Sequence, residues 1–224
     1  MGHVIYLDER RAGRSKKLPD TRPAFFFDVT SPLSYLMAER VERKLGDVDW
    51  VAADGMRLRD MWSRTGADAP SPVATESRPL RSRAEARARA LRLPLVWPDR
   101  FPGASPCAQR ACAFACELGA GGAFALAASR LAFCGGFDLE DPETLAEAAA
   151  AAGVPLEECL AAAGETWRDE ELEATARHLH AHGVTELPAI RIRGRWIQGE
   201  SGLLVAGALL NQAATSGLSR VPMA

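Results

Sequence analysis

Apolar positions near the start of the chain follow first a strand pattern and then a helix pattern. The run Ala24–Val29 is apolar except for Asp28 near its end, which predicts a buried strand. Apolar residues then recur at helical spacing over residues 33–45, and Gly46 ends the segment. Residues 48–53 (VDWVAA) predict a second strand. A helix between two such strands forms a βαβ unit, so we expect the two strands to be parallel.

The middle of the chain is mostly helical in pattern. Residues 55–77 carry glycine and prolines and are predicted to be irregular, and residues 93–101, with two prolines, to be extended or looped. Between and after these segments, glycines and proline-containing pairs separate amphipathic or alanine-rich runs. The predicted helices cover residues 82–92, 106–118, 120–134, 142–152, 155–163 and 165–182.

Strand character returns near the C-terminus. Residues 189–193 and 195–198 flank Gly194 and predict a hairpin, followed by a final helix over 202–216. The order βαβ, helical block, ββα predicts an α/β protein with a thioredoxin-like fold and a large inserted all-helical domain. We assign residues 1–22 to an N-terminal extension, which could hold a short strand at 3–7. Residues 23–60 and 184–224 form the thioredoxin-like domain, and 61–183 the inserted helical domain.

Composition narrows the class of protein. The chain has 224 residues, 47% of them hydrophobic and 25% charged, with a formal net charge of −2. This balance argues against nucleic acid as a partner, and no run is long and apolar enough to span a membrane. The five cysteines form no CxxC pair, which favours a reducing compartment over a disulfide framework, so we expect a cytoplasmic protein.

One turn carries candidate chemistry. In FFFDVTSPLSYL, residues 25–36, Ser31 stands where a helix N-cap is expected, and Pro32 takes the first helical position. Ligands of open α/β sheets bind where a parallel strand ends and a helix begins. A redox-active thioredoxin-like protein would carry a CxxC pair here, but this chain has Ser31 and Ser34. The Ser31 hydroxyl could donate a hydrogen bond to a thiolate brought in by a cofactor, or it could serve only as an N-cap.

A second candidate lies far downstream, at Glu186-Leu187-Pro188-Ala189. A proline directly before a strand indicates a cis peptide bond, an edge strand or an ordinary loop end. In thioredoxin-like folds a cis-proline faces the helix-start site. The backbone of the preceding residue, here Leu187, pairs there with the cysteine backbone of a peptide or of glutathione.

Three segments together resemble one family. FFFDVTSPLSYL, WPDRFPGASPCAQRA and HGVTELPAIRIRGRWIQGESGL are similar to the 2-hydroxychromene-2-carboxylate isomerases and kappa-class glutathione transferases, a branch of the DsbA-like thioredoxin-fold proteins. The resemblance implies that Ser31 holds the glutathione thiolate as the catalytic residue, and that the substrate is an aromatic 2-hydroxy acid. It is also compatible with a homodimer.

The segment before the last helix departs from the family pattern. Members carry an acid that helps to hold the γ-glutamyl ammonium of glutathione, and here Ser201 takes that position while Glu200 precedes it. We therefore assign Leu187, Pro188, Glu200 and Ser201 to cofactor binding, with glutathione, another thiol or no thiol all open. We assign Tyr35, Arg57 and Trp62 to substrate binding.

The arginine-rich stretch 78–92 has two interpretations. It holds six arginines and one acid, and it could be a solvated helix face or a wall that faces an anionic substrate. Arg59 and Arg64 are further candidates for binding a substrate carboxylate. The histidines at 178, 180 and 182 fall on different faces of a helix, so we expect no metal site. The alternative to an isomerase or transferase is a non-redox thioredoxin-like protein that binds a small molecule or a peptide, and a dithiol oxidoreductase is not expected.

Overall fold

The structure, a computed structural model, describes residues 22–65 and 77–218. The N-terminal extension up to residue 21, with its predicted strand at 3–7, and the segment 66–76 lie outside these residues. In chain order the elements are β1 (Ala24–Phe27), α2 (Pro32–Leu45), β2 (Asp49–Ala52), α3 (Gly55–Thr65), α4 (Ser77–Leu91), α5 (Pro106–Glu117), α6 (Gly121–Gly135), α7 (Pro142–Ala152), α8 (Leu156–Gly164), α9 (Arg168–Ala181), β3 (Ala189–Ile192), β4 (Arg195–Gln198) and α10 (Gly202–Leu218).

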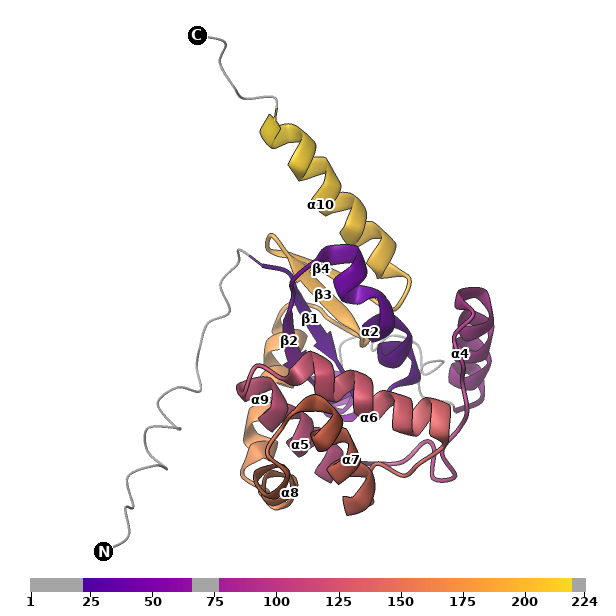
Figure 1. The fold of residues 1–224 in the computed structure, drawn as a ribbon. Helices are drawn as coiled ribbons and strands as arrows, with labels where there is room; N and C mark the ends of the chain where they lie inside the picture. The colour runs from indigo at the N-terminus through magenta and orange to yellow at the C-terminus, as the bar shows by residue number, and fades with distance from the viewer. Residues whose placement is uncertain (1–21, 66–76, 219–224) are drawn as a thin grey trace, which may run out of the picture.

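The strands of the described residues form one sheet of four in the order β2-β1-β3-β4. β1 is parallel to β2, as the βαβ pattern predicted, and antiparallel to β3, which forms a hairpin with β4. Phe26 in the central strand faces Val51 on one side and Ala189 on the other. The sheet, with helices inserted between β2 and β3, confirms the predicted thioredoxin-like fold with a helical insertion (Figure 1).

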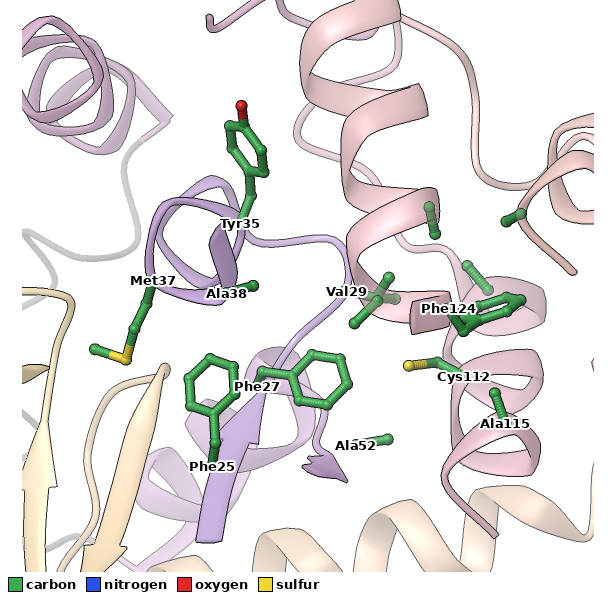
Figure 2. Packing of buried hydrophobic residues seen from close by; sticks show 14 of the residues in the cluster. Phe25, Phe27, Val29, Tyr35, Met37, Ala38, Ala52, Cys112, Ala115 and Phe124 are labelled. Atoms are coloured by element: carbon green, nitrogen blue, oxygen red, sulfur yellow. The ribbon is translucent and has the colours of Figure 1, made fainter. Parts of the chain in front are cut away.

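Alternate residues of β1 supply the two sides of the core. Phe25 and Phe27 point to the side packed by α2, α5 and α6, where Figure 2 shows them near Cys112 and Phe124. Phe26 belongs instead to a second cluster with Leu58 of α3 and residues of α9. Because successive side chains of a strand point to opposite faces, a strand covered on both faces is apolar at every position, which explains the unbroken run in the sequence.

Helix α3 corrects the prediction that residues 55–77 are irregular. Asp54 lies before it, and its Oδ1 accepts hydrogen bonds from the backbone N–H groups of Met56 at 2.8 Å and Arg57 at 3.2 Å. Leu58 and Met61, three residues apart, are buried beneath the sheet. The apolar face of this helix is narrow and several arginines surround it, so the helical period of apolar residues in the sequence is weak. The Asp54 cap and the two buried residues nevertheless suffice to form the helix.

Helix α9 joins the helical insertion to the sheet. Leu172 near its start packs with the large core cluster, whereas Ala176 and Leu179 near its end pack beneath the sheet with α3. Arg168 in its first turn is 3% exposed and binds Glu117 of α5 at 2.6 Å. The packing therefore continues across the predicted domain boundary at residue 183.

The remaining middle helices confirm the sequence prediction to within a few residues at their ends. Gly136 and Gly153, both with positive φ, end α6 and α7 in the left-handed conformation that glycine tolerates best. Within residues 22–65 and 77–218, no helix is both long and apolar enough to cross a membrane.

Candidate functional site

The turn after β1 carries Ser31 at the start of α2. Ser31 is the N-cap, with φ −96° and ψ 123°, and its Oγ accepts a hydrogen bond of 3.4 Å from the Ser34 N–H. Ser31 is half-buried, and its own N–H donates to the Asp28 carbonyl at 3.0 Å. Because Oγ acts as an acceptor toward the helix, the hydroxyl proton stays available to a ligand. The helix N-terminus adds a partial positive charge at this point, which favours an anion such as a thiolate.

The peptide bond Leu187–Pro188 is cis, as one of the sequence interpretations required. The Pro188 carbonyl accepts a 2.8 Å hydrogen bond from the Gly199 N–H, which holds the segment against the end of the hairpin. A Cβ placed on Gly55 would lie 3.0 Å from the Asp28 carboxylate and 3.9 Å from Leu187 Cδ1. Asp28, which precedes the serine turn, and Leu187 of the cis-proline segment are more than 150 residues apart in sequence, yet both lie beside Gly55 at the start of α3.

Asp28 lies beneath the turn and was not recognised as a site residue from the sequence. It is 6% exposed, and its Oδ1 accepts hydrogen bonds from Thr30 N at 2.8 Å, Thr30 Oγ1 at 2.6 Å and Gln109 Nε2 at 2.6 Å. Its Oδ2 accepts from Gly55 N at 2.9 Å. Burial, and to a smaller extent the charge of Asp54, raises the pKa of Asp28, while the hydrogen bonds from Thr30 and Gly55 oppose the rise. One carboxylate thus joins the turn, α3 and α5.

Glu200 is buried and already paired. It is 3% exposed, and its carboxylate forms ion pairs with Arg40 of α2 and Arg87 of α4. We call these three residues the Glu200 clasp. The neighbouring Ser201 is exposed. The structure therefore places Glu200 in a position to link two helices, with both carboxylate oxygens engaged by arginines.

The arginines of α4 attach the helix to the rest of the molecule. Arg83 pairs with Glu186, next to the cis-proline segment, at 3.1 Å. Arg81 donates to the Phe101 carbonyl at 2.8 Å and lies 4.8 Å from the ring centre of Trp97. Together with Arg87 in the clasp, these contacts show why the stretch is rich in arginine, and they differ from both sequence interpretations: the three side chains are neither simply solvated nor free to bind an anion.

The three residues assigned to substrate binding do not come together at the turn. Tyr35 is 1% exposed and its hydroxyl donates to the Pro94 carbonyl at 3.1 Å, so it is a core residue. Arg57 is held by the carboxylates of Asp54, Asp169 and Glu173. Trp62 donates to the Val184 carbonyl at 2.7 Å, and its ring packs against His180 of α9 with ring centres 4.3 Å apart. Tyr35 is near Ser31 in sequence, but its side chain is buried against Phe133, with ring centres 5.8 Å apart, and Figure 2 shows it pointing away from Phe25 and Phe27.

A pocket opens beside the turn. Thr30 forms part of its wall, and the rest comes from the segment 98–105, the end of α6 and residues 137–140. About 70 Å³ of it is open to the centres of water molecules, room for roughly five waters at about 10–15 Å³ each. Phe101, Phe133 and Phe137 form apolar walls. Part of this wall lies in WPDRFPGASPCAQRA, one of the three segments that resemble the family, but no pattern in the sequence indicated a pocket there or its completion by residues 137–140.

The five cysteines lie in helices α5, α6 and α8, and none belongs to the serine turn. Cys112 and Cys159 are fully buried, and burial raises the pKa of both thiols, that of Cys159 to about 11. A buried thiol with a raised pKa is a poor nucleophile at neutral pH. In the part of the chain that the structure describes, no group of three His, Cys, Asp or Glu side chains could hold a metal ion.

The sheet, the serine turn and the cis-proline together define a thioredoxin-like protein of the DsbA type. The sequence of the DsbA-like thioredoxin domain matches residues 24–208, and the chain belongs to this family. No curated protein sequence matches the chain.

Three solved structures share the fold. A 2-hydroxychromene-2-carboxylate isomerase is 15% identical, with a TM-score of 0.72, and the match covers 89% of this chain and 99% of that one. A probable DsbA oxidoreductase from Streptomyces coelicolor is 22% identical, with a TM-score of 0.62 and coverage of 91% and 92%. A putative protein disulfide isomerase from Nitrosomonas europaea is 12% identical, with a TM-score of 0.57 and coverage of 86% and 98%. These neighbours include an isomerase and oxidoreductases, and at such identities they show the fold alone.

Proposed function

We propose that the chain is a thiol-dependent isomerase or transferase that acts on an aromatic compound, with glutathione as the first candidate thiol. The observation that carries the proposal is Ser31 at a helix N-terminus, with its hydroxyl proton available. The cis Leu187–Pro188 bond supports it, since Leu187 and Asp28 both lie beside Gly55. A hydroxyl and a helix N-terminus can stabilise a thiolate without exchanging disulfides with it. A bound thiol would supply a nucleophile for reversible addition to a conjugated double bond, chemistry that needs no net redox change.

The residues of the chain would each have a defined task. Ser31 would donate a hydrogen bond to the sulfur, and the backbone of Leu187 would align the peptide portion of the thiol as an added strand. Asp28, through Thr30, would hold the turn in place. The pocket beside Thr30 would receive the aromatic partner and exclude water from it.

The fit to glutathione is good at its thiol end and weaker at its γ-glutamyl end. Glu200, the residue assigned to the ammonium group, is enclosed by Arg40 and Arg87, and Ser201 brings no charge. This observation favours a second candidate function, a non-redox thioredoxin-like protein that binds a small molecule or a peptide in the same groove without glutathione.

Isothermal titration with glutathione tests the first proposal. We expect the Ser31→Ala variant to bind roughly 10-fold or more weakly than the wild type, because a hydrogen bond to a charged group contributes about 1.5–3 kcal/mol. S-methylglutathione lacks an ionisable thiol, so its affinity should be the same in both proteins.

Ser63→Ala provides a matched control, since Ser63 is an exposed serine of α3 whose hydroxyl donates to the Arg59 carbonyl. Binding that is equal in the Ser31 and Ser63 variants would remove Ser31 from the site. If the wild type bound neither glutathione nor another small thiol, the result would favour the second candidate, a non-redox binding protein, over the thiol-dependent enzyme.

A further inference from the structure

The pocket beside the turn has an unusual balance of charges for a site expected to receive an aromatic acid. Three charged residues line it: Arg100, Asp138 and Glu140. Arg100 Nε lies 3.4 Å from Asp138 Oδ2, so these two charges compensate each other. Glu140 then remains as the additional charge. The lining of the pocket is therefore negative in sum, although its walls are aromatic.

Glu140 is held in position by hydrogen bonds to two neighbouring segments. Its Oε1 accepts a 2.9 Å hydrogen bond from the Cys107 N–H in the first turn of α5, and its own N–H donates to Asp138 Oδ1 at 3.0 Å. The N-terminus of α5 offsets part of this charge, about half an elementary unit at most, so the sum stays negative. Ser105, the N-cap of α5, also lines the pocket, and its side chain makes no cap hydrogen bond.

None of the arginines expected to bind a substrate carboxylate lines this pocket. Arg57 lies among three carboxylates, and Arg83 and Arg87 are paired with glutamates. Arg81 lies 5.5 Å from the ring centre of Phe101 and donates a hydrogen bond to the Phe101 carbonyl, but it does not line the pocket. A carboxylate entering the pocket would lose water without gaining an unpaired cation, and it would meet Glu140.

The mouth of the pocket is shaped to place an aromatic ring. Phe137 lines the pocket yet is 52% exposed. A Cβ on Gly135 would lie 2.5 Å from two carbons of the Phe137 ring, so only glycine at position 135 allows the ring to stand where it does. Phe101 and Phe133 stand edge to face with ring centres 6.1 Å apart and form the inner wall. Offset and edge-to-face partners of this kind favour a flat ring as the guest.

We infer that this pocket binds a small aromatic ring that bears an uncharged hydrogen-bond donor, such as a phenolic hydroxyl, and rejects aromatic carboxylates. The three phenylalanines contact the ring of the ligand. The carboxylate of Glu140, or that of its neighbour Asp138, accepts a hydrogen bond from the ligand's hydroxyl. The inference rests on the proposed function in one respect only, namely that this pocket receives the aromatic substrate. It changes the expected substrate from an aromatic acid to a phenol-like compound.

Titration of the ¹⁵N-labelled protein with phenol and, separately, with benzoate tests the inference by NMR. We expect phenol to shift the amide signals of residues 101 and 137–140 and to bind at least about 10-fold more tightly than benzoate, since a like charge at close range costs more than one factor of ten. Glu140→Gln should weaken the binding of phenol by roughly 3–10-fold, the usual contribution of a hydrogen bond. The same substitution should strengthen the binding of benzoate. Arg100→Gln should change the affinity for phenol by no more than about twofold.

Gly135→Ala examines the aromatic wall without removing a core side chain. The added methyl group must displace the exposed Phe137 ring, so phenol should bind more weakly while the amide spectrum of the sheet stays unchanged. Benzoate binding that exceeds phenol binding and is lost in Arg100→Gln would overturn the inference, and so would the absence of shifts around the pocket with either compound. These outcomes are separate from the thiol measurement, because Ser31 and glutathione take no part in them.

Discussion

Glu200→Gln is expected to lower the free energy of unfolding by about 3–5 kcal/mol, because it leaves buried arginine charge without its partner. Arg40 is 8% exposed, and the glutamine cannot compensate it together with Arg87. Urea denaturation at neutral pH, followed by circular dichroism, measures the loss as a lower midpoint. The effect follows from the Glu200 clasp, which joins α2, α4 and the segment before α10.

Glu186→Gln is the matched control, since it removes the partly exposed pair with Arg83 on the same helix α4. A pair of this exposure contributes less than about 1 kcal/mol. If Glu200→Gln left stability unchanged but abolished thiol binding, Glu200 would be a ligand-binding residue, as its sequence position suggested, and the clasp would carry little energy.

Asp28→Ala is expected to destabilise the protein by about 2–4 kcal/mol, because it leaves the Gly55 N–H and the Gln109 amide without their acceptor in a buried site. Gln109 is 3% exposed and its Oε1 has no partner among the described residues, so water can do little to replace the acceptor that its amide loses. Urea denaturation of this variant beside Asp60→Ala, an exposed aspartate of α3 expected to change stability by less than about 0.5 kcal/mol, measures the difference.

The raised pKa of Asp28 predicts how this contribution depends on pH. A carboxyl whose folded pKa lies above its unfolded value of 3.8 contributes most below that value and loses the contribution as pH rises through the folded pKa. Asparagine resembles the protonated carboxyl. The stability of the wild type relative to Asp28→Asn should therefore fall as pH is raised from about 4 to 8, and a difference that rises with pH would show that the hydrogen bonds outweigh the burial of Asp28.

The strands and most helices were predictable because each depends on neighbouring residues, whereas the cis bond at Pro188 was one of several alternatives that the sequence left open. The apolar run 24–27, the cap at Ser31 and the Gly194 turn all specify local structure within a few positions. Helix α3 was not predicted, because two buried side chains among arginines give a weak period. The fold class could be inferred from the order of elements alone.

The site was only half predictable, because its polar contacts are long-range. Ser31 and Pro188 could be paired through the known geometry of the fold, but Asp28 and Gln109 are 81 positions apart, and Arg40 and Glu200 are 160 apart. A single sequence does not reveal such partners. For the same reason the sequence did not show that Tyr35, assigned to the substrate, is a core residue. Nor did it show that Arg83 and Arg87 of α4 pair with glutamates and that Arg81 lies over an aromatic ring.

Helix α9 limits how the molecule can be divided. Its first turn is tied to α5 through Arg168, and its last turns lie under the sheet beside Phe26. If the inserted helices were deleted together with α9, one face of the central strand would lose its cover. If they were deleted and α9 were kept, the buried Arg168 would lose its partner on α5. Amide hydrogens in the sheet and in the helical insertion should therefore exchange with solvent through the same global opening, and the insertion cannot be detached as a module.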